Sequence, residues 1–178
     1  MTRVCVVAAT LVGLSAQSQA PARKPDVIWV PTEPAVVSAM LKMARVTKND
    51  VVYDLGCGDG RIVIAAAQKF GARGVGVDID PARIYEAEMN ARRAGVEKLV
   101  TFKLQDALKT DVSDATVVTL YMLSAINVKL RPILTKELRS GSRIVSHNFA
   151  IGDWEPDKVE TFKDAAGATR TLYLWTIR

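Results

Sequence analysis

The sequence predicts an α/β protein with a three-layer αβα sandwich, in which a mostly parallel sheet ends in an antiparallel hairpin. Short apolar runs alternate with segments of helical spacing up to residue 146, an order that requires parallel strands covered on both faces. Residues 159–177 break this order, because two strand-like runs follow one another there without a helix. With 178 residues, 49% of them hydrophobic, the chain can bury one core, and we expect a single domain over residues 21–178.

The N-terminal segment precedes this domain and has a different composition. Arg3 is followed by an apolar run over residues 4–14, which is shorter than the roughly 20 residues that span a bilayer as a helix. Ser18-Gln19-Ala20 then offers small residues around a cleavage point. We predict a signal peptide over residues 1–20, whose removal would leave a periplasmic or secreted protein. A leader that is retained would instead anchor the protein in a membrane.

Charge and cysteine content set limits on the partners. The formal net charge is +5, but lysine and arginine are scattered among aspartate and glutamate along the chain, so the charge does not indicate a nucleic-acid partner. Cys57 is the only cysteine after the predicted leader, which excludes an internal disulfide in the domain. We expect a monomer that binds no metal ion and no nucleic acid.

The first half of the domain follows from local patterns. Thr32 can cap a first helix, since Pro34 falls in its first turn and apolar residues recur at helical spacing up to Ala44; this helix is expected to cover the sheet. Val51–Asp54 is an apolar run that ends at a glycine-rich turn, as a buried strand does before a loop. The same order predicts helices over 62–70 and 80–94 and strands over 74–78 and 99–104.

The second half begins with a nearly continuous apolar run over residues 117–123, which predicts a strand buried on both faces. Helical spacing follows over residues 126–138, where Pro132 is expected to kink or restart the helix. The remaining strands are expected over 142–146, 159–162 and 171–177, the last two joined by a turn over 164–168.

A glycine-rich loop carries the first chemical signal. Asp54 is followed by glycines at 56, 58 and 60, and glycines let a backbone approach a ligand closely. A dinucleotide site requires the spacing Gly-x-Gly-x-x-Gly around a pyrophosphate, whereas here the third glycine comes one residue early and carboxylates stand at Asp54 and Asp59. Carboxylates suit a cationic ligand such as S-adenosylmethionine (SAM), whose ammonium group Asp54 can meet. The loop also falls where the strand order should reverse, the usual ligand position in such sheets.

Further carboxylates follow the next two strands. Asp78 lies 24 residues after Asp54 (78 − 54) and can accept hydrogen bonds from both ribose hydroxyls, with Ile79 against the adenine. Asp106 is placed to accept from the adenine amino group, although it could instead cap a local turn. Thr32, with Trp29 and Pro31, could form part of a lid. The predicted cofactor-binding residues are Thr32, Asp54, Gly56, Gly58, Asp59, Asp78, Ile79 and Asp106.

These signatures resemble those of class I SAM-dependent methyltransferases, which implies a Rossmann-like sheet. More narrowly, five segments resemble the small membrane-associated protein-lysine methyltransferases, a family that in mitochondria modifies the c-ring protein of the ATP synthase and the adenine nucleotide translocase. These segments are Val30-Pro31-Thr32, the loop from Asp54 to Val63, Arg93-Ala94-Gly95-Val96, Ser142 to Ser146, and Trp154-Glu155-Pro156. The resemblance implies N-methylation of a protein lysine and possible membrane association through the N-terminus.

Methyl transfer requires a nucleophile held in line with the methyl group, and positioning with exclusion of water can supply much of the catalysis. Tyr121 is the leading candidate to border the acceptor pocket, although a tyrosine could simply end the apolar strand there. His147, the only histidine, has no evident carboxylate partner, and a structural role is favoured over that of a general base. Asp153 and Trp154 either line the substrate entrance or, for Trp154, close the core under the hairpin.

Three functions therefore remain. A protein-lysine methyltransferase is favoured by the flanking segments, and a small-molecule N- or O-methyltransferase would require a closed and small cleft. A SAM-binding module without catalysis is the third. A dehydrogenase is disfavoured, because both the glycine spacing and Asp54 oppose a pyrophosphate.

Overall fold

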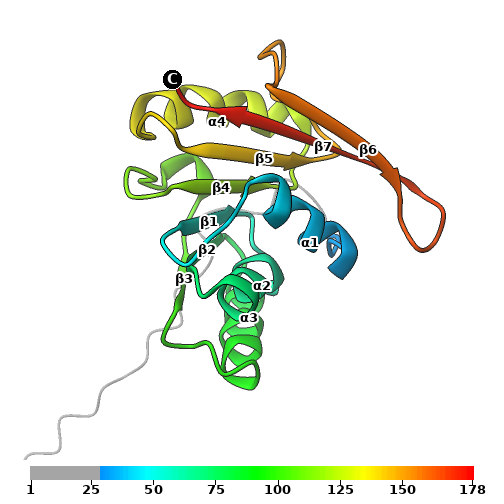
Figure 1. The fold of residues 1–178 in the computed structure, drawn as a ribbon. Helices are drawn as coiled ribbons and strands as arrows, with labels where there is room; N and C mark the ends of the chain where they lie inside the picture. Colours follow the sequence, from blue (N-terminus) through cyan, green and yellow to red (C-terminus); the bar gives the residue numbers. More distant parts are fainter. Residues whose placement is uncertain (1–28) are drawn as a thin grey trace, which may run out of the picture.

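The structure is a computed structural model that describes residues 29–178, and its centre is a seven-stranded sheet (Figure 1). The predicted signal peptide lies outside the described residues and stays a prediction. The sheet order is β3-β2-β1-β4-β5-β7-β6. The strands are β1 (Val51–Leu55), β2 (Arg73–Asp78), β3 (Val100–Leu104), β4 (Val117–Leu120), β5 (Arg143–His147), β6 (Lys158–Lys163) and β7 (Thr169–Thr176).

The sheet combines a parallel part with an antiparallel edge. Strands β1 to β5 pair in parallel, while β7 is antiparallel to both β5 and β6. The chain builds outward from β1 to β3, then returns to place β4 on the other side of β1, so the order reverses between β1 and β4. These findings confirm the predicted fold class, including the terminal hairpin. They also place the carboxyl end of β1, with its glycine loop, at the reversal point where such sheets bind ligands.

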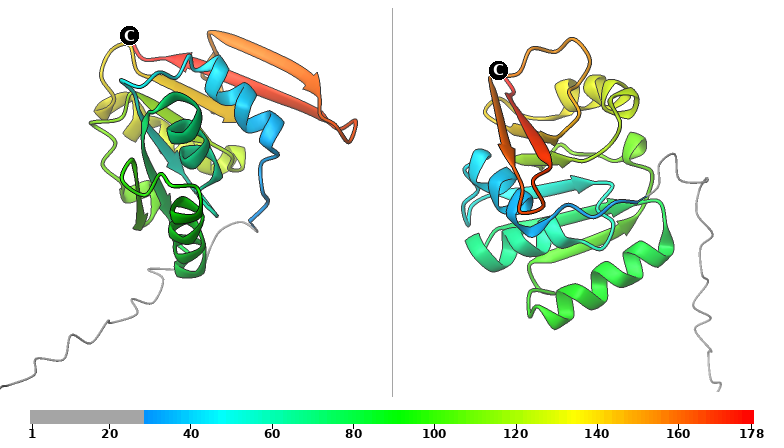
Figure 2. Two further views of the ribbon diagram at one scale, coloured as in Figure 1. Left: turned by 60° about the horizontal axis from the view of Figure 1, so that its bottom comes forward. Right: turned by 90° about the vertical axis from the view of Figure 1, so that its right-hand side faces the viewer.

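Helices cover both faces of the sheet, but unequally (Figure 2). Helices α1, α2 and α3 lie on one face, and α4 with the short 3₁₀ helix η1 lies on the other. The first helix contacts β5 and β7 and so covers the sheet, as predicted. The helices are α1 (Pro34–Met43), α2 (Arg61–Phe70), α3 (Pro81–Arg93), η1 (Ala107–Lys109) and α4 (Ser124–Glu137).

Two apolar cores follow from the alternation of side chains along the strands. In β1, Val52 packs with the three-helix layer, while its neighbours Val51 and Tyr53 pack with the α4 layer. In β4, Val117 and Val118 divide in the same way. Successive strand residues point to opposite faces, so a strand covered on both sides must be apolar throughout. The continuous apolar runs in the sequence therefore reflect this double burial.

The first helix begins one residue later than its predicted cap implies. Its N-cap is Glu33, which makes no capping hydrogen bond through its side chain, rather than Thr32. Glu33 precedes Pro34, and the residue before a proline is forced out of the helical region; Glu33 is accordingly extended, with φ −64° and ψ 148°. Thr32 is instead buried, and its carbonyl oxygen accepts a hydrogen bond from Arg61 Nη1 at 2.8 Å.

Three further boundaries differ from the sequence expectations. Strand β4 ends at Leu120, not at residue 123, because its pairing with β1 and β5 stops there and Leu123 already precedes α4. Helix α4 runs through Pro132 without restarting, since fully buried residues on either side, Leu130 and Leu134, hold it against the sheet. Helix η1 was not predicted, because three residues carry no periodic signal.

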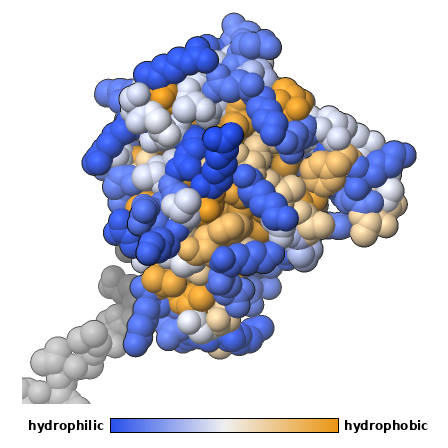
Figure 3. All heavy atoms as spheres, in the orientation of Figure 1, coloured by the Kyte–Doolittle hydropathy of each residue, from blue (hydrophilic) through white to orange (hydrophobic). Residues whose placement is uncertain are grey.

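The surface in the orientation of Figure 1 is mostly hydrophilic, with smaller apolar areas visible between the charged side chains (Figure 3). Within residues 29–178, no helix is long and apolar enough to cross a membrane. The hairpin of β6 and β7 extends past the end of β5, since β7 pairs with β6 from Thr169 onward but with β5 only from Leu172 onward. Its turn therefore projects from the edge at which β1, β2 and β4 also end.

Candidate cofactor and acceptor site

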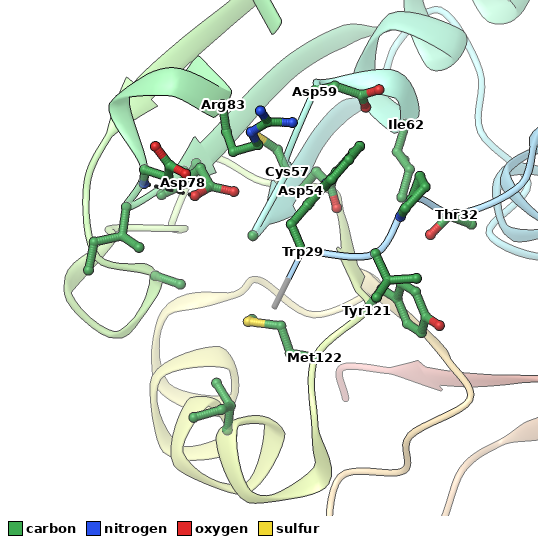
Figure 4. A pocket seen from close by; sticks show the side chains of 18 of the residues that line it. Trp29, Thr32, Asp54, Cys57, Asp59, Ile62, Asp78, Arg83, Tyr121 and Met122 are labelled. Carbon is green, nitrogen blue, oxygen red and sulfur yellow. Dashed lines mark hydrogen bonds between the residues drawn. The ribbon is translucent and has the colours of Figure 1, made fainter. Parts of the chain in front are cut away.

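A cavity of about 280 Å³ opens at the carboxyl ends of β1, β2 and β4 (Figure 4). All the predicted site residues except Gly58 line it, and Gly58 lies within the loop that forms its floor. The cavity has two ends with different chemistry. A cofactor half is built by the loops after β1, β2 and β3, and an acceptor half is built by residues after β4 and β5. The acceptor half is lined by Tyr121, Met122, Leu123, Ile126 and Phe149.

The glycine loop is held by backbone hydrogen bonds and needs glycine for close packing. The amides of Gly56 and Cys57 donate to the Val77 carbonyl at 2.8 and 2.9 Å, which ties the loop to β2. Gly60 has a φ of +79°, and a Cβ there would lie 2.9 Å from the Cβ of Ala87 in α3. A side chain at Gly60 would therefore separate the loop from α3. This geometry explains why the third glycine is required even though it lies outside the cavity wall.

Asp54 is the most buried carboxylate of the site. Only 3% of the residue is exposed, and its Oδ1 accepts a hydrogen bond from the Thr119 hydroxyl at 2.7 Å. Burial raises the pKa of Asp54 to about 7, and the nearby charges of Asp78 and Asp59 raise it further. A cation placed in the cavity would offset the cost of this buried charge. The ammonium group of SAM fits that requirement.

Asp78 links the glycine loop to the start of α3. Its Oδ2 accepts from the Gly58 amide and its Oδ1 from the Asp80 amide, both at 2.9 Å. Each carboxylate oxygen retains a second lone pair, so the side chain can still accept from two vicinal hydroxyls. Ile79 follows it and lines the same part of the cavity. These residues fit the ribose and adenine of SAM.

Asp106 combines the two roles that the sequence left open. Its Oδ1 accepts from the Leu108 amide at 3.0 Å, and it thereby caps η1. The same residue lines the cavity on the β3 side. Capping does not use all of its acceptor capacity. The cap holds the carboxylate at the position where an adenine amino group is expected.

Asp59 has a partner that the sequence did not predict. Arg61 Nε donates to its Oδ1 at 2.9 Å and Arg61 Nη2 to its Oδ2 at 2.6 Å, in a bidentate ion pair. Since Arg61 also donates to the Thr32 carbonyl, it ties the segment before α1 to the glycine loop. The charge of Asp59 is therefore largely compensated. Thr32 and Asp59 border the cavity, but these contacts serve to assemble its wall.

Trp29 lies over the glycine loop, as expected for part of a lid. A Cβ at Gly58 would lie 1.9 Å from the indole Nε1, so the two residues are in direct contact. The guanidinium groups of Arg61 and Arg83 lie 5.8 and 4.8 Å from the indole centroid, within the range of cation–π attraction. Figure 4 shows the side chain between Asp54, Asp59 and Ile62. The segment before α1 therefore covers the cofactor half.

The acceptor half is built from aromatic side chains. Tyr121 follows β4 and Phe149 lies two residues past β5; their ring centroids are 6.1 Å apart. The Tyr121 ring stacks on His147, with centroids 4.0 Å apart and an interplanar angle of 29°. His147 is 1% exposed and does not line the cavity, and burial lowers its pKa to about 4. A direct role as general base is therefore not supported.

Two of the candidate residues lie elsewhere. Asp153 is exposed and pairs with Arg131 of α4, with 2.5 Å between Oδ1 and Nη1. Trp154 packs on Trp175, whose indole Nε1 donates to the Trp154 carbonyl at 2.9 Å. Neither lines the cavity. Trp154 thus closes the core beside β7, the second of the two roles considered for it, and neither residue lies at the substrate entrance.

Some lining residues were not predicted from the sequence. Phe149, Met122 and Leu123 follow strands β5 and β4, and Arg83 lies in α3. Their positions after parallel strands are a usable signal, since those strand ends meet at one edge. The residue types alone read as ordinary core. Within residues 29–178, no three His, Cys, Asp or Glu side chains are grouped so that they could hold a metal ion.

Sheet order, glycine loop and the carboxylates that follow three successive strands define a SAM-dependent methyltransferase with a Rossmann-like fold. Known proteins support this assignment. A sequence profile described as the ANTKMT methyltransferase domain matches residues 54–158. The chain belongs to this family of methyltransferases.

Individual relatives extend the match beyond that segment. A protein-lysine N-methyltransferase of Saccharolobus islandicus is 44% identical over 154 residues, covering 86% of this chain and 95% of the relative. A Xenopus laevis lysine N-methyltransferase that acts on the c-ring protein of the ATP synthase is 34% identical, covering 86% of this chain and 69% of the relative. A crystal structure described as an RNA methyltransferase from Salinibacter ruber with S-adenosyl-L-homocysteine is 52% identical, with a TM-score of 0.78 and coverage of 83% and 94%.

Proposed function

We propose that this methyltransferase transfers methyl groups from SAM to the ε-amine of a protein lysine. The observation that carries the proposal is the uncharged, aromatic acceptor half of the cavity, beside a cofactor half rich in carboxylates. Lysine has a reference pKa of about 10.4 and must lose a proton before it can attack. Apolar surroundings favour the neutral amine. The protein-lysine methyltransferases among the relatives support the same acceptor.

Each part of the cavity has a defined task in this reaction. Bound SAM supplies an activated methyl group on its sulfonium. Asp54 binds the ammonium group and Asp78 the ribose, which together fix the cofactor in the loop. Tyr121 and Phe149 hold the lysine side chain and exclude water from the attacking nitrogen. No side chain of the acceptor half needs to act as a base, because the pocket favours the neutral amine itself.

RNA is the alternative acceptor, suggested by the Salinibacter structure. The cavity argues against it, because Asp54, Asp78, Asp80 and Asp106 present carboxylates there and would repel a phosphate backbone. Arg61 is already paired with Asp59. We therefore propose a protein acceptor and no nucleic-acid partner. A small-molecule acceptor and a SAM-binding module without catalysis are further outcomes that the assay below distinguishes.

We also propose that the protein acts as a monomer at a membrane, through its N-terminal apolar run. Trp29 lines the cavity, so the chain before it reaches the folded domain at the site itself. A leader retained in the membrane would hold the site near the bilayer and keep the enzyme where SAM is made. Cleavage of the leader would give an exported protein instead. N-terminal sequencing of the protein from membrane and soluble fractions distinguishes the two.

The acceptor class can be tested with SAM labelled in its methyl group. The purified full-length chain is incubated with membrane proteins, soluble proteins, total RNA and a metabolite extract. We expect label in protein, and mass spectrometry should locate it on lysine. Label confined to RNA or to small molecules would contradict the proposal. SAM binding without label in any fraction would favour the non-catalytic module.

Replacing Tyr121 tests the acceptor half directly. In Tyr121→Ala the lysine loses one wall of its pocket, and we expect kcat/KM for the protein substrate to fall about tenfold, close to 1.4 kcal/mol. The Kd for SAM should stay within about twofold, since Tyr121 contributes to positioning of the acceptor. Tyr85→Ala is the matched control, because Tyr85 is 67% exposed and does not line the cavity. Equal losses of SAM binding and turnover would assign Tyr121 to the cofactor instead.

A further inference from the structure

His147 is a buried titratable residue that the proposed mechanism does not use. It ends β5, where it pairs with Leu172 of β7, and only 1% of it is exposed. Neither ring nitrogen has a hydrogen-bond partner among residues 29–178. An unpaired buried polar atom costs about 1–3 kcal/mol. The imidazole therefore contributes to its surroundings through its ring face, and that face lies against Tyr121.

The strand register explains why Tyr121 needs this support. The last paired residues of β4 and β5 are Leu120 and Ser146, so Tyr121 is the first residue beyond the pairing and lies beside His147. Tyr121 has no ladder partner, whereas His147 is still held by β7. The position of the phenol ring thus depends on side-chain packing. The stacked imidazole, at 4.0 Å between centroids, supplies a flat and rigid surface for it.

The imidazole is also uncharged. Burial, together with the charge of Arg170, lowers the pKa of His147 to about 4. Arg170 itself is held away by Asp164, with 2.7 Å between Nε and Oδ2. A neutral ring behind Tyr121 adds no positive charge that would repel a lysine side chain in front of it.

We infer that His147 is the positioning residue of the acceptor half, which holds the Tyr121 ring in place for the incoming lysine by stacking behind it. The inference rests on the proposed lysine acceptor, because Tyr121 borders the pocket proposed for it. His147 itself touches neither cofactor nor acceptor, since it does not line the cavity. Its removal should therefore affect the acceptor and leave the cofactor unaffected.

The kinetic test compares three variants of the full chain. We expect His147→Ala to lower kcat about tenfold, with the Kd for SAM unchanged within about twofold. His147→Phe retains a flat ring and should recover at least a third of wild-type kcat. Val145→Ala is the matched control, because Val145 is buried on the same face of β5 and packs in the three-helix core. It should lose stability without a change in kcat of the folded protein.

A spectroscopic test separates this inference from the lysine proposal. The protein is labelled with 3-fluorotyrosine, and its four tyrosine signals are compared by ¹⁹F NMR, with Tyr121→Phe assigning the signal of interest. We expect that signal to move toward the free amino acid in His147→Ala and to remain in place in His147→Phe and Val145→Ala. An unmoved signal in His147→Ala, or the same displacement in Val145→Ala, would overturn the positioning role. Failure of lysine methylation with the expected displacement would refute only the acceptor class.

Discussion

The two halves of the cavity are held together by different forces. In the cofactor half, backbone amides close the geometry: Gly58 and Asp80 donate to Asp78, and Gly56 and Cys57 donate to the Val77 carbonyl. In the acceptor half, Tyr121 lies beyond the last strand pairing, and its ring rests on a side chain from another strand. The first half is built by local sequence and the second by packing. Substitutions should therefore act locally and strongly in one, and through distant neighbours in the other.

The largest effect is expected at Asp78, which joins the cofactor contacts to the loop. In Asp78→Ala the ribose loses its acceptor and the Gly58 and Asp80 amides lose theirs. We expect SAM affinity measured by calorimetry to fall about 100-fold, near 3 kcal/mol, as for hydrogen bonds to a charged group. Asp78→Asn retains one acceptor oxygen and should lose less. Unchanged binding in the alanine variant would show that the cofactor half depends on packing as well.

Gly60 tests how tightly the loop is packed on α3. A Cβ there would meet Ala87 Cβ at 2.9 Å and the Phe102 ring at 2.6 Å, at a φ of +79°. We expect Gly60→Ala to lower the free energy of unfolding by about 3 kcal/mol in urea titrations. Gly95→Ala is the control, because Gly95 has a φ of +67° with nothing within 4 Å. It should cost about 1 kcal/mol from the backbone alone. Similar losses at both sites would mean that close packing is not required.

The raised pKa of Asp54, about 7, predicts two opposite pH effects. Because the folded pKa exceeds the ordinary value of 3.8, the folded protein binds the proton more tightly, and the contribution of Asp54 to stability falls as pH rises from about 4 to 7. SAM binding needs the ionised form, so SAM affinity should fall by up to about tenfold between pH 8 and pH 6.

Calorimetry on Asp54→Asn separates the carboxyl from the cofactor. The amino group of SAM titrates alike with both proteins, so the ratio of the two affinities reports Asp54. We expect that ratio to change across pH 6 to 8. A constant ratio would show that Asp54 does not titrate in this range.

The smallest effect is expected outside both halves. Asp153 is 93% exposed and its partner Arg131 is 40% exposed. Such surface pairs contribute below about 1 kcal/mol, and Asp153→Ala should change the unfolding free energy by less than about 0.5 kcal/mol. Methylation should be unaffected. A clear loss of kcat/KM would extend the acceptor half to the loop after β5.

Sequence patterns determined the fold class and the cofactor half almost completely. The Asp-x-Gly-x-Gly-x-Gly loop, Asp78 and Asp106 are local signals, because each follows a strand directly and parallel strands end at one edge. The sequence also identified Tyr121 as a border residue. These predictions succeed because backbone geometry over a few residues places the side chain.

Tertiary structure decided what the local signals could not. The pairing of Asp59 with Arg61, the stacking of Tyr121 on His147 and the place of Phe149 join segments that no periodic pattern relates. The exclusion of Asp153 and Trp154 from the cavity also depends on the path of the loop after β5. Side-chain packing between distant segments is set by the whole fold, so the acceptor half becomes visible only once the strands are assembled.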